Sequence, residues 1–253
     1  MLQDAHERLR PILQRRDNGF RWRGKDISRI EGLSDAVFGF AVTLLVVSLE
    51  APKTFTALRH LMHGFVSFGV CFALLLMIWH SQYIFFRRYA LDDMRTFVLN
   101  AALLFVVAFY IYPLKFLFTV VTNGLTGYQE MDDAGKAIVA MQWQDWRPLM
   151  LIYGAGFVAL YCIFALLYLH AWSKRNDLGL NELESYLTRG SVNENLLMVG
   201  LGIISLTFAF MGAPRLSGLT YALIGPIQGF YGARQGNRRK AIVARMDAQD
   251  TTT

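Results

Sequence analysis

Long apolar stretches separated by short polar segments dominate this chain. Six of them reach the length of about 20 residues that a helix needs to cross the hydrocarbon core of a bilayer. They cover residues 27–49, 56–86, 96–121, 148–172, 195–211 and 216–233. The fifth contrasts least with its flanks, and the sixth is interrupted by Gly225, Pro226 and Gly229, which membrane helices tolerate where neighbours satisfy the backbone. The pattern predicts an all-α membrane protein with six transmembrane helices per subunit.

The composition agrees with a membrane protein and leaves little room for a soluble domain. Of the 253 residues, 54% are hydrophobic and only 17% are charged, and the mean hydropathy is +0.33. We divide the chain into a basic N-terminal segment (1–26), a transmembrane domain (27–233) and a basic tail (234–253). No HExxH, GxSxG or glycine-rich phosphate loop occurs, and the five histidines lack metal-ligand spacing. We therefore expect neither an enzyme nor a bound cofactor.

The basic residues predict how the chain is oriented. With six spans, both termini lie on one side of the membrane, and that side holds all but six of the 25 Lys and Arg residues. The exceptions are Lys53, Arg59, Lys115, Lys136, Arg147 and Arg215. Cytoplasmic loops are enriched in Lys and Arg, so we expect a multi-pass protein of the plasma membrane with both termini in the cytoplasm. This topology explains the net charge of +6 without nucleic acid as a partner.

The N-terminal segment suggests a contact with the membrane surface. It is rich in arginine and contains Phe20 and Trp22. Aromatic side chains beside basic residues are typical of segments that lie at a lipid interface. We expect these two residues to act as interfacial anchors, with anionic lipid as the partner of the basic side chains.

Polar side chains lie inside three predicted spans at a similar depth below the cytoplasmic surface. They are Arg29, Ser34 and Asp35 in the first span, Trp79 and His80 in the second, and Asn100 in the third. An ionisable group at the edge of the hydrocarbon costs roughly 2 to 3 kcal/mol, so these residues are expected to have partners. Two interpretations remain open: a structural clamp between helices, or part of a conduction or proton path.

A second face of the first predicted helix carries a narrow stripe. Its members, at the spacing i, i+4, i+7, i+11 and i+14, are Ala36, Phe40, Thr43, Val47 and Glu50. If several copies of the helix surrounded an axis, they would form an apolar ring at Phe40, a hydroxyl ring at Thr43 and an acidic ring at Glu50 that concentrates cations. A lipid-facing or packed apolar stripe explains the same spacing, and spacing alone favours that simpler interpretation.

The first helix also contains a recognisable motif. Arg29-x-x-x-Leu33-Ser34-Asp35, followed by an apolar run, resembles the Arg-x-x-x-Phe-Ser-Asp signature of the transmembrane protein 175 family, the endolysosomal potassium channel and its bacterial relatives. The likeness extends through residues 27–115, and it includes Trp79-His80, Asp92-Asp93, Asn100 and Pro113. The last three helices match mainly in number and spacing. No second signature occurs, so the chain resembles the single-repeat bacterial form.

The resemblance implies a homotetramer in which the first helix of each subunit lines a potassium-permeable pore. Phe40 would form the hydrophobic constriction and Thr43 would be linked to ion selectivity, with Val47 and Glu50 of the stripe further along. The structural polar network that the resemblance implies comprises Arg29, Ser34, Asp35, Trp79, His80 and Asn100. Potassium would be the permeating ion and not a cofactor.

Two departures from the family pattern bear on this expectation. Leu33 stands where the signature has an aromatic residue, which changes packing, and Phe40 stands where the constriction usually has Ile or Leu, which bears on conductance. Two other functions remain as alternatives. One is a proton-coupled transporter or proton leak that uses Asp35 and His80, and the other is a non-conducting membrane scaffold of the same fold.

Overall fold

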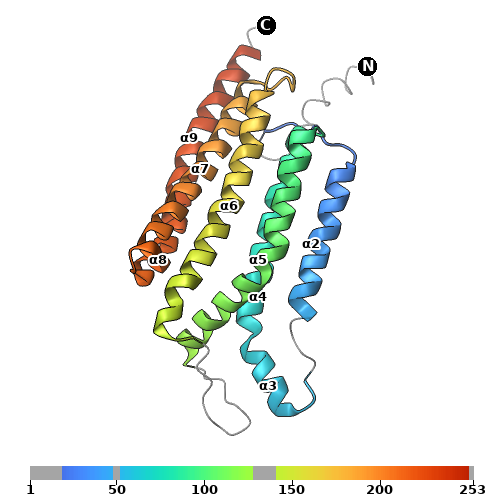
Figure 1. Cartoon of the computed structure of the whole chain (residues 1–253). Helices are drawn as coiled ribbons and strands as arrows, with labels where there is room; N and C mark the ends of the chain where they lie inside the picture. Colours follow the sequence, from blue (N-terminus) through green and yellow to red (C-terminus); the bar gives the residue numbers. More distant parts are fainter. Residues whose placement is uncertain (1–18, 48–51, 128–140, 251–253) are drawn as a thin grey trace.

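The computed structural model describes residues 19–47, 52–127 and 141–250, and all of its regular structure is helical. The helices form an elongated bundle (Figure 1). They are α2 (Arg29–Val47), α3 (Phe55–His63), α4 (Phe65–Tyr89), α5 (Met94–Thr126), α6 (Trp146–Ser173), α7 (Glu182–Phe210), α8 (Pro214–Thr220) and α9 (Ile224–Asp250), with the 3-10 turns η1 (Trp143–Asp145) and η2 (Tyr221–Leu223).

Five segments are long and apolar enough to cross a membrane: α2, α4, α5, α6 together with η1, and α7. They correspond to the first five predicted spans. The sixth predicted span, 216–233, forms α8, η2 and the start of α9, which run back alongside α7 (Figure 1). This segment is not among the five, because α9 combines several glycines with a basic second half.

Two helix boundaries differ from the prediction. The second span was expected as one helix over 56–86, but the structure breaks it at Gly64 into α3 and α4. The fifth was expected to begin at residue 195, whereas α7 begins at Glu182. Its first turns are polar, yet they are helical because Asn181 and Glu184 form a reciprocal capping box and because Glu184 has partners elsewhere in the chain.

Helices α6 and α7 pack closely through small residues. A Cβ atom on Gly202 of α7 would lie 2.6 Å from Val158 of α6, and one on Gly156 would lie 1.9 Å from the ring of Tyr110 on α5. Only glycine permits this approach, as is common between membrane helices. Helix α2 instead lies at one edge of the bundle, where it packs mainly on α4 and α5 (Figure 1).

Residues 19–28 cross one end of the bundle before α2 begins. We call this the basic end; it also contains the α4–α5 and α6–α7 connections and the last turns of α9. The backbone N–H groups of Arg23 and Gly24 donate to the carbonyl oxygen of Arg87 at 3.0 and 3.2 Å. Ser28 and Glu31 then start α2, since the Ser28 N–H donates to the Glu31 carboxylate and the Glu31 N–H donates to the Ser28 hydroxyl.

Phe20 and Trp22 were expected to anchor the N-terminal segment at the lipid interface, but both pack against α4. Phe20 is completely buried and meets the ring of Tyr89 edge-on at 5.4 Å. Trp22 is half-buried and meets Tyr83 in the same way at 6.1 Å. The prediction was wrong for Phe20, because a local pattern cannot show that this segment folds back on α4.

Candidate pore helix and its polar anchor

Helix α2 has one face inside the bundle and one outside it. The buried positions follow the helical repeat and are Ile30, Glu31, Ser34, Phe38, Ala41 and Leu45. On the opposite face, 60% of Phe40 and 69% of Val47 are exposed, and Thr43 is exposed between them. We call this the open face of α2. A membrane helix with such a face contacts lipid, water or another copy of the chain, because its own subunit does not cover it.

The predicted pore-lining stripe coincides with the open face as far as the structure describes it. Ala36, Phe40, Thr43 and Val47 are all exposed, and Gly39 lies among them. The Thr43 hydroxyl donates to the carbonyl oxygen of Gly39 at 2.9 Å, which is the usual way for a hydroxyl in a membrane helix to satisfy its hydrogen. Glu50, the predicted outer ring, lies outside the described residues.

The inner face of α2 is joined to the bundle by a buried chain of hydrogen bonds. The Nδ2 amide of Asn100 on α5 donates to Ser34 Oγ at 2.8 Å, and Gln82 Nε2 on α4 donates to Asn100 Oδ1 at 2.6 Å. The Ser34 hydroxyl donates in turn to the carbonyl oxygen of Ile30 at 2.7 Å. All three side chains are buried. We call Ser34, Gln82 and Asn100 the polar anchor.

Gln82 is the member that sequence reasoning missed. Gln82 stands among polar and aromatic residues near the end of α4. The sequence there does not distinguish a buried glutamine from one that faces the lipid head groups. The available signal was its position three residues after Trp79, which places both side chains on the same side of α4.

Asp35, at the edge of the open face, is hydrogen-bonded to Trp79. It is not bonded to His80, the other residue of the possible proton path. Trp79 Nε1 donates to Asp35 Oδ1 at 2.8 Å. His80 is exposed and stacks on Tyr83 with ring centroids 6.2 Å apart. His80 and Gln82 are two residues apart and therefore point about 160° away from each other around α4, so His80 turns away from the anchor.

Of the six predicted network residues, four form hydrogen bonds with one another and two do not. Ser34 with Asn100, and Asp35 with Trp79, form the two hydrogen-bonded pairs. In the part of the chain that the structure describes, no hydrogen bond joins Arg29 or His80 to these four. Arg29 is exposed in the first turn of α2, where a long cationic side chain reaches the polar surface.

The basic end contains a charged cluster that the sequence did not suggest. The Glu184 side chain is fully buried, and its carboxylate accepts from Arg21 Nη2 at 3.0 Å and from Arg23 Nη2 at 2.7 Å. The Arg21 backbone N–H also donates to it at 2.9 Å. These bonds fasten the segment before α2 to the start of α7, across 163 residues of sequence.

A second cluster joins the start of α5 to the end of α6. Asp93 caps α5 by accepting from the Thr96 N–H, and its Oδ2 lies 2.6 Å from both His170 Nε2 and Lys174 Nζ. Burial alone would raise the pKa of the Asp93 carboxyl, but hydrogen bonds from Lys174, Thr96 and His170 outweigh that effect and hold the pKa well below its ordinary value. No group of three metal-ligating side chains occurs within residues 19–47, 52–127 and 141–250.

Comparisons with known sequences find potassium channels, and the matched region includes α2. Residues 29–110, which contain α2, α4 and the first half of α5, match the family described as endosomal/lysosomal potassium channel TMEM175. A potassium channel of Marivirga tractuosa is 38% identical over 233 residues, covering 88% of this chain and 94% of that protein. A potassium channel of Chamaesiphon minutus is 31% identical over 100 residues, covering 36% of this chain and 49% of that protein.

Solved structures agree with the sequence comparisons. A variant of the potassium channel MtTMEM175, crystallised with a nanobody–MBP fusion protein, matches with a TM-score of 0.75 at 36% identity over 88% of this chain and 99% of that chain. A lysosomal potassium-selective TMEM175 homologue from Chamaesiphon minutus matches with a TM-score of 0.51 at 21% identity over 82% of this chain and 96% of that chain, which concerns the fold alone.

Together, the fold and these relatives define the class as helical, multi-pass membrane channels and not enzymes. Within that class, this chain belongs to the TMEM175 potassium channel family. The family predicted from the motif around Arg29 and Asp35 is confirmed.

Proposed function

We propose that four copies of this chain form a potassium-permeable channel in which the open face of each α2 lines a central pore. The observation that carries the proposal is the division of α2 into a buried face and an open face that contains the predicted stripe. Other helices, such as α4 and α5, also leave faces uncovered, so exposure alone does not select α2. What favours α2 is that its open face carries the predicted stripe with Phe40 and Thr43, in a chain of a potassium channel family.

The composition of the open face suits a wall where helices approach an axis. Gly32, Ala36, Gly39 and Thr43 are all exposed and small, and no side-chain atom lies within 4 Å of the position that a Cβ atom would take on either glycine. Small residues let membrane helices come close together. Leu33 and Phe40 are the bulky exposed residues in this stretch, and Phe40 is the one next to Thr43. A ring of Phe40 side chains would be a narrow apolar collar that excludes water when closed. Thr43 would supply the only hydroxyl ring next to it.

The other expected features complete the proposal. Residues 214–233 form a helical path of about 30 Å, long enough for a sixth crossing beside α7. The concentration of Lys and Arg at the basic end supports a cytoplasmic location for that end in the plasma membrane, next to anionic lipid. The polar anchor and the Asp35–Trp79 bond would hold α2 in position, and Glu50 would form the acidic outer ring.

The test compares two phenylalanines with similar exposure. Phe40 on α2 is 60% exposed, and Phe109 near the middle of α5 is 65% exposed. Purified protein in liposomes should show a potassium flux that rises at least severalfold for Phe40→Ala and stays unchanged for Phe109→Ala. Thr43→Val should reduce the preference for potassium over sodium, since it removes the hydroxyl and keeps the shape. Mass measurement in lipid nanodiscs should give a tetramer.

Other outcomes would decide against the proposal. Equal flux changes for Phe40→Ala and Phe109→Ala would show that α2 does not line the pore. A monomer in nanodiscs would remove the central axis altogether. Flux of protons without potassium would favour the transporter or proton leak, although Asp35 is bound to Trp79 and not to His80 within the subunit. No flux from the wild type or from Phe40→Ala would favour the scaffold.

A further inference from the structure

A partly open cavity of about 460 Å³ lies between the helices, behind α2. Its walls come from α4, α5, α6, α7 and α9, and α2 contributes only Leu45, from its buried face. Sites for small organic ligands have volumes of about 300–1,000 Å³, so this space is large enough for one. It is separate from the open face of α2, so a ligand bound there would not depend on the proposed pore.

Aromatic rings form much of the cavity wall. They are Tyr110 of α5 and Tyr153, Phe157, Tyr161, Phe164 and Tyr168 of α6. Phe157 and Tyr161 lie one turn apart with ring centroids 4.6 Å from each other. The faces of such rings carry negative potential and attract a cation that comes within about 6 Å. The wall therefore suits an apolar ligand that also carries a positive charge.

One carboxylate belongs to this wall. Glu194 of α7 lines the cavity, and among the described residues its carboxylate has no hydrogen bond or salt bridge, although the charge of Arg88 acts on it from a distance. Its depth follows from Thr188 on the same helix, whose hydroxyl is hydrogen-bonded at 2.8 Å to Tyr89 at the end of α4. Glu194 is six residues further along, about 9 Å deeper in the bundle.

The contrast with Glu184 shows what Glu194 lacks. Glu184 is fully buried and is neutralised by Arg21 and Arg23. Acidic side chains inside a membrane are costly, so they pair with a cation or face water or a ligand. Asn195, beside Glu194, donates its amide hydrogen to the carbonyl oxygen of Ser191 at 2.8 Å, which leaves its own carbonyl oxygen as an acceptor. The polar groups around Glu194 therefore favour a hydrogen-bond donor with positive charge.

We propose that the cavity binds a lipophilic amine in its protonated form. The ammonium group lies against the Glu194 carboxylate and the Asn195 carbonyl oxygen, and the apolar body of the ligand lies along the aromatic wall of α6. A compound of this kind partitions into the bilayer and can enter from the lipid. The carboxylate gives the site its preference for a cation, and the rings give it affinity for the apolar part.

Photolabelling of the full chain in lipid nanodiscs tests this site. The probe is dodecylamine carrying a diazirine, and the competitors are dodecylamine and the uncharged dodecanol, at neutral pH. Labelled peptides should come from α6 and α7, and dodecylamine should compete about tenfold better than dodecanol. Glu194→Gln should lower the affinity for dodecylamine about tenfold and leave dodecanol unchanged.

Two further variants distinguish the effect of the Glu194 charge from the effect of the cavity volume. Ser191→Trp, one turn before Glu194, should fill the cavity and abolish competition by both compounds while the carboxylate remains. Glu182→Gln makes the same charge change at an exposed position in the first turn of α7 and should leave labelling unaltered. Wild-type oligomeric mass for all variants shows that they are folded.

Three results would overturn the proposal. Equal competition by dodecanol and dodecylamine would mean that the cavity does not recognise charge. Full retention of amine binding by Glu194→Gln would remove the carboxylate from the site. Loss of the oligomer in Glu194→Gln, with no competition by dodecylamine in the wild type, would show that Glu194 pairs with a basic side chain of a second copy.

Discussion

Helices α2 and α7 are held in the bundle by different means, although the same share of their most apolar windows, 33%, is buried. Helix α7 is fastened at its first turn by a carboxylate that binds two arginines, and it lies against α6 at Gly202. Helix α2 is held near its second turn, on its inner face, by the neutral side chains of the polar anchor. The buried share does not distinguish the two helices. They differ in that α7 is held by ion pairs and α2 by neutral hydrogen bonds.

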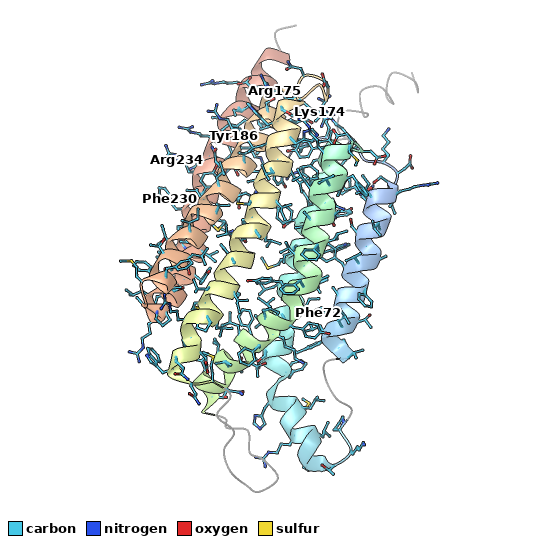
Figure 2. All side chains as sticks on the ribbon, viewed as in Figure 1. Phe72, Lys174, Arg175, Tyr186, Phe230 and Arg234 are labelled. Carbon is cyan, nitrogen blue, oxygen red and sulfur yellow. The ribbon has the colours of Figure 1, made fainter. Side chains whose placement is uncertain are left out.

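The two fastenings differ in how close their polar groups lie to water. The arginines that bind Glu184 belong to the basic end, where Figure 2 shows the basic side chains of Lys174 and Arg175 as well. There the two arginines keep part of their surface in water although Glu184 is buried, so these ion pairs cost less to form than they would deeper in the membrane. The polar anchor lies deeper, where neutral hydrogen bonds between helices are worth about 0.6 to 2 kcal/mol each. Helices α6 and α7 therefore form the firmer part of the subunit, and α2 is the more weakly fastened one.

The largest expected effect comes from removing the charged fastening. Glu184→Ala leaves Arg21 and Arg23 without their shared partner and leaves the first turn of α7 without its capping carboxylate. We expect a loss of about 3 kcal/mol in the free energy of unfolding, measured by thermal unfolding in detergent. Glu182→Ala, at an exposed position on the same turn, is the matched control. An equal loss in both variants would mean that the buried position of Glu184 does not matter.

A smaller effect is expected when the hydrogen bonds of the polar anchor are removed. Asn100→Ala removes the acceptor of Gln82 and the donor to Ser34, so we expect a loss of about 1 to 2 kcal/mol, measured in the same way. Asn237→Ala, at an exposed position on α9, is the control. If Asn100→Ala were as destabilising as Glu184→Ala, α2 would be held as firmly as α7. A lower oligomer yield for Asn100→Ala would show that the position of α2 also matters for assembly, since α2 is the proposed pore helix.

The smallest effect concerns pH. Because the pKa of Asp93 is lowered from its ordinary value of 3.8 in the folded chain, the carboxylate contributes stability at higher pH, and that contribution is lost as pH falls below the ordinary value. Asp93→Asn keeps an effective helix cap and removes the charge. The variant should unfold at a slightly lower temperature at neutral pH and should lose less stability on acidification than the wild type. Asp92→Asn, next to it and exposed, should behave like the wild type over the whole pH range.

The exposed stripe of α2 could be predicted because the evidence for it is local. Ala36, Phe40, Thr43 and Val47 follow the helical repeat, so their common face can be computed from spacing, and the structure places all four on the open face. The motif from Arg29 to Asp35 likewise lies within about two turns of one helix, and it led to the correct family. Periodicity and short motifs capture contacts within one helix.

The remaining features depend on contacts between distant parts of the chain. Nothing near Glu184 in the sequence indicates that Arg21 and Arg23 will reach it, so the polar start of α7 looked like a loop. Gln82 and His80 are both polar residues near the end of α4, and only packing against α5 shows which of them faces Asn100. The break at Gly64 was missed because glycine is tolerated within membrane helices.

The hydrogen bond from Thr43 to Gly39 has a consequence for the sign of the ions that α2 could pass. Since the hydroxyl hydrogen is directed to the backbone of its own helix, only the lone pairs of the oxygen remain for a neighbouring ion. A ring of such oxygens would solvate a cation that has shed part of its water, and it would offer an anion no donor. Discrimination by charge would thus follow from the direction of one proton, with no charged residue at that level of the helix.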